Sequence, residues 1–231
     1  MDNPPGAAGT VPGDSSGATA RRYEKDFWSE ANLKFAQAHF RLAKAARLAN
    51  TIARGRERDL LDIGCGPGTL GRLLDKNIGY YGIDIAVHDP APNMIEADLV
   101  KNPVKFGDRS FDIVVGQGVF EYMSSAQSEK FAEISQLLTR NGTFIVSYWN
   151  FGHRGRQVYE AFSNVQPLGE FRDSLARHFI VDRSFPVGHN WHHREPGRKP
   201  VMAAQMHLNL NIPFISPLLA VEYFFICSPR R

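Results

Sequence analysis

The 231-residue chain has only two cysteines, Cys65 and Cys227, which are too few for a network of disulfides. This scarcity predicts two reduced thiols in a protein of the cytoplasm. A long apolar segment is also missing. The longest run, residues 212–226, is interrupted by two prolines and a glutamate, and it is shorter than the roughly 20 residues of a membrane span. The formal net charge of +3 is too small to indicate nucleic acid or a membrane surface as a partner.

The first 20 residues are poor in large apolar side chains and consist mostly of Gly, Pro, Ala, Ser and Thr. Such a composition buries too little apolar surface to offset the entropy that ordering removes, so we expect a disordered tail over residues 1–20. It lacks the basic start and apolar centre of a signal peptide. We expect one folded domain over residues 21–231, because the chain's 43% hydrophobic and 22% charged residues are typical of globular proteins.

The rest of the chain alternates between strand and helix patterns. We predict strands at 59–63, 80–85, 93–97, 111–116, 143–149, 178–185 and 221–227, and helices at 29–53, 67–76 and 125–139. Arg41, Lys44 and Arg47 follow one another at helical spacing and are expected to form a solvated face. Alternation of this kind predicts an α/β fold, with a parallel sheet between helices.

The most informative segment is residues 60–70. A short apolar strand is followed by Asp62 and then by Gly64, Gly66 and Gly68, so that the spacing is D-x-G-x-G-x-G. Glycines placed in this way let the backbone turn tightly and approach a ligand. Dinucleotide-binding folds use G-x-G-x-x-G instead, since a helix N-terminus there holds a pyrophosphate. Asp84 ends the next predicted strand, where an acidic residue accepts hydrogen bonds from a ribose.

These features resemble motif I and the following acid of class I methyltransferases that use S-adenosylmethionine (SAM). Three later segments also resemble that family: 97–99, 110–122 and 137–144. The last of these is expected to contain a tight turn at Asn141-Gly142. The resemblance implies a Rossmann-like sheet of seven strands, mostly parallel with an antiparallel last strand, and helices on both faces. It also implies an aromatic stretch that closes over the cofactor, here with Tyr23 and Trp28; the alternative is that these rings pack the first helix onto the sheet. The expected SAM-binding residues are Tyr23, Trp28, Asp62, Gly64, Cys65, Gly66, Gly68, Asp84, Ile85, Ala97, Asp98, Leu99, Gln117, Gly118 and Val119.

About 35 residues, Pro186 to Ala220, separate the last two predicted strands, which form a plain hairpin in the resembled family. We expect this insertion, with a helix at 201–211, to cap the substrate; a surface flap or a dimer contact are the alternatives. A histidine is the base best matched to neutral pH, and the candidates are His153, His189, His192 and His193. Should all four be dispensable, the alternatives are catalysis by proximity alone or another group, such as Glu121 or Tyr148. No metal site is predicted, because three loop histidines lack an accompanying cysteine or carboxylate pattern.

The predicted function is methyl transfer from SAM to a small molecule. The alternatives are an NAD(P)-dependent oxidoreductase, an RNA methyltransferase and a SAM-binding regulatory protein without catalysis. The glycine spacing counts against the oxidoreductase. Residues 116–119 lack the Asn/Asp-Pro-Pro-Tyr/Phe sequence that stacks a flipped base, so nucleic acid is not the expected partner. The sequence leaves open whether the chain forms a homodimer.

Overall fold

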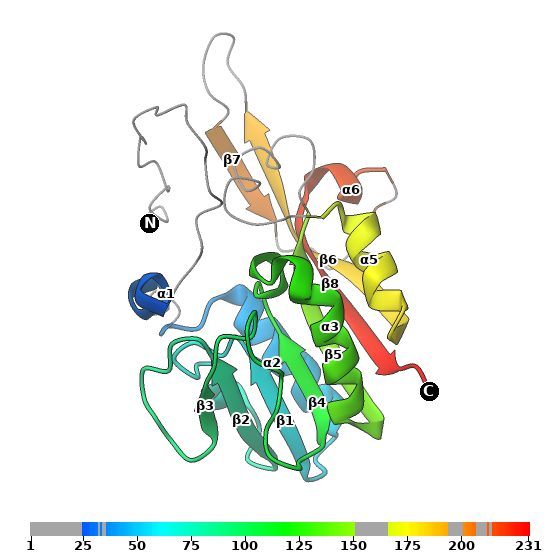
Figure 1. Ribbon diagram of the computed structural model, residues 1–231. Helices are drawn as coiled ribbons and strands as arrows, with labels where there is room; N and C mark the ends of the chain where they lie inside the picture. The colour runs from blue at the N-terminus through cyan, green and yellow to red at the C-terminus, as the bar shows by residue number, and fades with distance from the viewer. Residues whose placement is uncertain are drawn as a thin grey trace, which may run out of the picture.

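The computed structural model describes residues 25–31, 33, 36–150, 166–193, 201–206, 212 and 214–231. Within these residues, eight strands form one sheet in the order β3-β2-β1-β4-β5-β8-β6-β7 (Figure 1). The strands are β1 (Arg58–Ile63), β2 (Ile78–Asp84), β3 (Met94–Glu96), β4 (Phe111–Gly116), β5 (Leu138–Trp149), β6 (Phe179–His193), β7 (Val201–Met206) and β8 (Ala220–Pro229). The tail predicted over residues 1–20 lies outside the described residues.

Strand direction divides the sheet into two parts. The first five strands pair in parallel, as Leu61 of β1 opposite Val114 of β4 illustrates. β8 lies antiparallel to β5, with Val146 opposite Phe225, and β6 lies antiparallel to β8. The predicted α/β fold, mostly parallel with antiparallel strands at the end of the chain, is confirmed. β7 adds one strand to the seven predicted.

Apolar side chains fill both faces of the sheet, because successive strand residues point to opposite sides. Phe144 and Val146 of β5 pack on the face that α3 (Gln127–Leu137) and α5 (Leu168–Ala176) cover. Ile145 packs on the other face, together with the buried alanines of α2 (Phe40–Ala53), which are Ala45, Ala46, Ala49 and Ala53. Their small side chains let α2 lie close to the strands.

The single helix predicted over 29–53 is wrong in its first part. The chain instead forms α1 (Lys25–Ala31) and, after a break, α2. α2 begins after His39, whose Nδ1 accepts the N–H of Arg41 at 3.2 Å. The imidazole thereby satisfies a backbone donor that has no partner inside the helix, so the helix begins at this point.

The helix predicted over 67–76 is also wrong. Residues 66–70 form turns, and only η2 (Gly71–Leu73), a single 3₁₀ turn, follows. Gly66 and Gly68 have φ angles of 52° and 66°, which a right-handed helix does not use. The glycine loop therefore leads into further turns.

The turn predicted at Asn141-Gly142 lies within a strand. α3 ends at Leu137 and β5 begins directly at Leu138, two residues before the predicted helix end. The pairing of β5 with β4 shifts from Leu138 opposite Phe111 to Thr143 opposite Ile113. The extra residues form a bulge, so β5 contains the tight bend that the sequence predicts as a loop.

The segment predicted as an insertion begins inside a strand. Pro186 pairs with Tyr223, and β6 continues to His193 although Pro186 indicated a strand end. Register shifts after Pro186 and after Gly188 absorb the missing N–H as bulges. The helix predicted at 201–211 is wrong over 201–206, because these residues are β7 and pair antiparallel with β6.

Short elements complete the described chain: η3 (Phe120–Tyr122), η4 (Ser124–Ala126) and α6 (Ser216–Leu219). Among the described helices, none has the length and apolar character needed to cross a bilayer.

Candidate functional site

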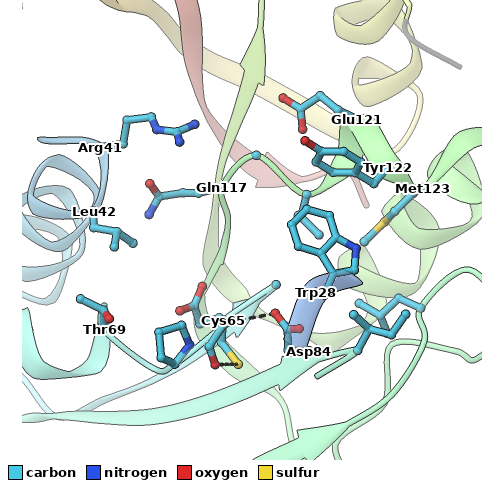
Figure 2. A pocket seen from close by; sticks show the side chains of 18 of the residues that line it. Trp28, Arg41, Leu42, Cys65, Thr69, Asp84, Gln117, Glu121, Tyr122 and Met123 are labelled. Atoms are coloured by element: carbon cyan, nitrogen blue, oxygen red, sulfur yellow. Dashed lines mark hydrogen bonds between the residues drawn. The ribbon is translucent and has the colours of Figure 1, made fainter. Parts of the chain in front are cut away.

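A pocket of about 380 Å³ lies where the parallel strands β1, β2, β4 and β5 end (Figure 2). This is the edge at which open α/β sheets bind ligands. Most of the residues predicted from the sequence line it: Trp28, Asp62, Gly64, Cys65, Gly66, Asp84, Ile85, Ala97, Asp98, Leu99, Gln117, Gly118 and Val119.

The remaining predicted residues are placed differently. Gly68 is not part of the pocket lining, and a Cβ there would face Met94 and Tyr80, so Gly68 shapes the turn behind the pocket. Tyr23 and His153 lie outside the described residues. His189, His192 and His193 belong to β6, but only their backbone is described. Within the described residues, no group of three or more His, Cys, Asp or Glu could hold a metal ion.

The conformation of the glycine loop lets its backbone lie close to neighbouring groups and to a ligand. Gly64 has a φ of 72°, and a Cβ at this position would lie 2.8 Å from Cγ2 of Val119. Such a distance is a clash, so only glycine fits there without movement. The N–H of Gly64 donates to the carbonyl of Ile83 at 2.8 Å, which fixes the loop against β2.

Asp84 fixes the same loop through its side chain. Its Oδ2 accepts the N–H of Gly66 at 2.8 Å, and its Oδ1 accepts the N–H of Ala86 at 2.9 Å. A carboxylate offers about four acceptor positions, more than these two backbone hydrogen bonds require. The carboxylate is 7% exposed and lines the pocket, which suits the predicted role of ribose acceptor.

Asp62 supplies a second buried carboxyl beneath the loop. Burial raises its pKa to about 7, opposed by a hydrogen bond from the hydroxyl of Tyr80 to Oδ2 at 2.9 Å. Burial also raises the pKa of the neighbouring Cys65 thiol, with Asp62 and Asp84 adding to the effect. Cys65 is therefore a neutral, buried thiol and no nucleophile.

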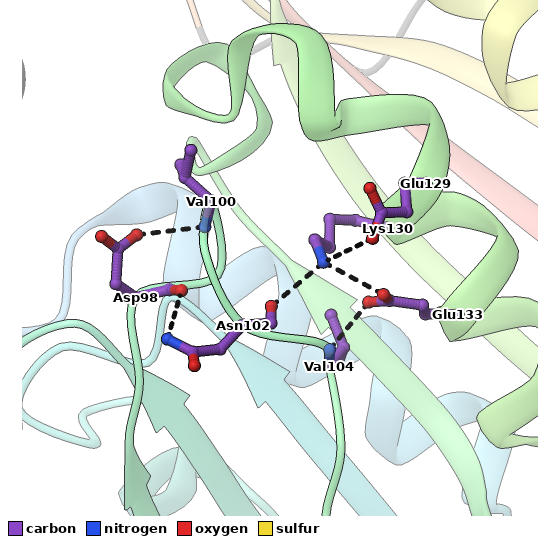
Figure 3. Close-up of polar contacts among 7 residues, drawn as sticks. All are labelled: Asp98, Val100, Asn102, Val104, Glu129, Lys130 and Glu133. Carbon is purple, nitrogen blue, oxygen red and sulfur yellow. Dashed lines mark hydrogen bonds and ion pairs between the residues drawn. The ribbon is translucent and has the colours of Figure 1, made fainter.

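The loop after β3, which brings Asp98 and Leu99 to the pocket, is held from α3 (Figure 3). Lys130, only 2% exposed, donates to the carbonyl of Asn102 and to Oε1 of Glu133, both at 3.0 Å. Oε2 of Glu133 accepts the N–H of Val104 at 2.7 Å. This buried ion pair thus fixes the loop that forms the pocket wall.

Aromatic rings form one side of the pocket. Trp28 of α1 meets Tyr122 of η3 edge to face, with ring centroids 4.9 Å apart. An ion pair between Lys25 and Glu96 ties α1 to β3. That interaction is exposed and adds little stability, whereas the ring contact between Trp28 and Tyr122 lies in the pocket lining.

Sequence reasoning missed most of the end of the pocket that lies opposite the glycine loop, where it named Glu121 only as an alternative base. The further lining residues are His39, Arg41, Leu42, Pro67, Thr69, Val100, Glu121, Tyr122, Met123 and Trp149. The expectation that Arg41 and Lys44 are solvated is wrong: both are half-buried, and of the three basic residues only Arg47 is exposed. Arg41 makes an ion pair with the buried Glu222 at 3.3 Å, a partner that lies 181 positions away in the sequence.

Buried polar atoms without partners gather at this end (Figure 2). Among the described residues, neither Oε1 nor Nε2 of Gln117 has a hydrogen-bond partner, and neither has Oε2 of Glu121. Such atoms are costly unless a ligand or water satisfies them. A polar ligand would satisfy these atoms, and the buried carboxyl groups of Asp62 and Asp84 at the other end fit a polar cofactor such as SAM.

Comparisons with known proteins agree with this geometry. The methyltransferase domain family matches residues 35–196, more than half of the chain. No curated protein matches. A SAM-dependent methyltransferase from Archaeoglobus fulgidus has a similar structure, with a TM-score of 0.60 at 14% identity over 88% of this chain and all of that one.

Two further structures share the fold. A putative methyltransferase in complex with the Trm112 activator of Haloferax volcanii aligns with a TM-score of 0.60 at 17% identity, covering 91% of this chain and 97% of that one. The N-methyltransferase NodS of Bradyrhizobium japonicum, bound to S-adenosylhomocysteine (SAH), aligns at 0.52 and 10% identity over 88% and 99%. The chain belongs to the methyltransferase domain family, and the prediction of a SAM-dependent methyltransferase is confirmed.

Proposed function

We propose that the protein transfers the methyl group of SAM to a small-molecule acceptor. The observation that carries this proposal is the two-ended pocket. Figure 2 shows Cys65, Thr69 and Asp84 at one end, and Arg41, Gln117 and Glu121 at the other. A volume of about 380 Å³ is typical of small-molecule sites.

The end formed by the glycine loop would hold the cofactor. Asp84 would accept the ribose hydroxyls, and Asp62 would line the cofactor site beneath the glycine loop. The face of an aromatic ring attracts a sulfonium cation, which supports Trp28 and Tyr122 as neighbours of the reacting group. When bound, SAM supplies an electrophilic methyl group, so the chain's own task is to position the acceptor and exclude water.

The other end would hold the acceptor, between polar and aromatic side chains. Figure 1 shows the β6–β7 hairpin standing beyond the edge at which the parallel strands end, which is the edge of the pocket. This position supports the expected cap within residues 186–220, with a dimer contact as the alternative. Two buried, free thiols, Cys65 and Cys227, support a reducing compartment such as the cytoplasm.

The histidine base remains a prediction, because the described residues include none of the four side chains. Alanine variants of His153, His189, His192 and His193 test it. Removal of a general base should lower turnover by about 10²–10⁴ while the affinity for SAH stays unchanged.

Two measurements test the function. Calorimetry with SAH and with NADH separates a methyltransferase from an oxidoreductase, and only SAH should bind. Labelled SAM is then incubated with a metabolite extract and, separately, with total RNA at physiological salt. Label in the metabolite fraction supports the proposal. Label in RNA favours the RNA methyltransferase, and SAH binding without any transfer favours a regulatory protein.

A further inference from the structure

Glu121, which the sequence names as an alternative to a histidine base, is an ionisable side chain at the acceptor end of the pocket. It lies in η3, just beyond the end of β4, and is 4% exposed. Glu121 is one of the residues that line the pocket, on the opposite side from Arg41 (Figure 2). Glutamate is almost never buried in this way unless it is paired, so its surroundings require an explanation.

One oxygen of Glu121 is fixed and the other is not. Oε1 accepts the backbone N–H of Trp149 at 2.9 Å, and Trp149 also lines the pocket at the end of β5. Oε2 is buried and has no hydrogen-bond partner among the described residues. The Trp149 contact therefore orients the carboxyl group, and Oε2 is left as an acceptor without a donor.

The surroundings of Glu121 raise the pKa of its carboxyl group into the neutral range. Burial is the main cause that raises its pKa, to about 7, and the buried Glu222 of β8 adds to it. Arg41 of α2 acts in the opposite direction but is already paired with Glu222. Tyr148 of β5 also faces this group, and its own pKa is raised, mainly by burial. Glu121 can thus both take up and release a proton near neutral pH.

Within the described residues, His39 is the histidine that lines the pocket, and it is not suited to accept a proton from the methyl acceptor. Its Nδ1 accepts the N–H of Arg41. Burial lowers its pKa to about 4, so the ring is neutral at pH 7 and carries its proton on Nε2. In that tautomer Nε2 donates a hydrogen bond, and neither nitrogen is available to accept a proton from an acceptor molecule.

We propose that Glu121 takes the proton of the attacking group, and that the methyl acceptor therefore presents an O–H or N–H to Oε2. The proposal rests on the proposed function. The lone pair of the acceptor atom forms the bond to the methyl carbon, and the electron pair of the broken carbon–sulfur bond stays on sulfur. The proton of the acceptor passes to Oε2, and it leaves to water after the product has departed.

The first test needs no acceptor. NMR of protein with ¹³C-labelled glutamate carboxyl groups is recorded during a pH titration. We expect one resonance that titrates near pH 7 in the wild type and in Glu57→Gln, and that is missing in Glu121→Gln. Glu57 is an exposed matched control just before β1, at the opposite end of that strand from the pocket. A Glu121 carboxyl that titrates near the ordinary value of about 4.3 overturns the proposal.

The second test measures transfer. Glutamine preserves the acceptor for the Trp149 N–H but cannot take a proton. With labelled SAM and a metabolite extract, Glu121→Gln should lose about 10²–10⁴-fold in rate. SAH affinity and melting temperature should stay at their wild-type values. The wild-type rate should rise as pH increases through about 7, and the residual rate of the variant should not.

The outcomes separate this proposal from the proposed function. If Glu121→Gln transfers methyl groups at the wild-type rate, the role of Glu121 is overturned and the proposed function is not affected. A wild-type protein that binds SAH but methylates neither the extract nor RNA overturns the proposed function, and this proposal with it.

Discussion

The backbone N–H of Gly66 donates to Oδ2 of Asp84 at 2.8 Å, and this bond joins the loop after β1 to the end of β2. Two features that are 18 residues apart in the sequence thus form one unit. Asp84 is both an expected ribose acceptor and the anchor of the glycine loop. Its removal should therefore affect binding in two ways, which different substitutions separate.

Asp84→Ala should weaken SAH binding by about 10- to 100-fold, because a charged acceptor is lost and the glycine loop loosens. Asp84→Asn retains one oxygen for the Gly66 or Ala86 N–H, so it should preserve the melting temperature better while still losing affinity. Calorimetry and thermal unfolding measure the two effects. The exposed Asp89 is the control, and Asp89→Ala should change neither. Full SAH affinity in Asp84→Ala would show that the carboxylate does not touch the cofactor.

Gly64 and Gly55 form a matched pair for a second experiment. Both have a positive φ, 72° and 71°, but a Cβ at Gly55 meets nothing within 4 Å, whereas one at Gly64 meets Val119 at 2.8 Å. Gly55→Ala should therefore lower the free energy of unfolding by only about 1–2 kcal/mol, which is the strain of an alanine in the left-handed backbone conformation. Gly64→Ala should cost roughly 1–3 kcal/mol more through overpacking, and should also weaken SAH binding. Equal losses in chemical denaturation would contradict the predicted clash.

The sequence predicts the cofactor end of the pocket better than the acceptor end, for a physical reason. Asp62, Gly64 and Gly66 follow one strand directly, so a local pattern specifies their geometry, and Asp84 recurs at the end of the next strand. Glu222 meets Arg41 only because β8 is inserted beside β5. The two residues are 181 positions apart, and no local pattern encodes their contact.

The boundaries of the strands are also predicted well only where a local pattern specifies them. β4 is predicted to the residue, because its apolar run ends at a glycine. β6 extends eight residues past its predicted end, because bulges accommodate Pro186 and Gly188. Local propensity at a proline favours a strand end, and pairing with β8 and β7 overrides it.

Asp62 gives the stability of the protein a pH dependence with a definite sign. Its pKa is raised from 3.8 to about 7 by burial, so the folded protein binds this proton more tightly than the unfolded chain does. Its contribution to the free energy of unfolding is therefore greatest below about pH 4 and is lost as pH rises through about 7. Relative to Asp62→Asn, which retains an acceptor for Tyr80, the wild type should lose stability between these values and change no further above them. Urea denaturation across this range measures the difference, and a constant difference would contradict the buried, protonated carboxyl.

Trp28 offers the most selective test of the aromatic wall, because SAM and SAH differ in charge at the sulfur. Trp28→Ala removes the ring that lines the pocket and meets Tyr122 at 4.9 Å. A cation–π contribution of about 0.5–2 kcal/mol corresponds to a loss of roughly 2- to 30-fold in affinity for the sulfonium, beyond any loss for the neutral thioether. We therefore expect calorimetry to show a larger loss for SAM than for SAH. Phe27→Ala is the control, since Phe27 lies beside Trp28 on α1, is 48% exposed and does not line the pocket. Equal losses for the two ligands would mean that Trp28 contributes only apolar contact, and that the sulfonium lies elsewhere in the pocket.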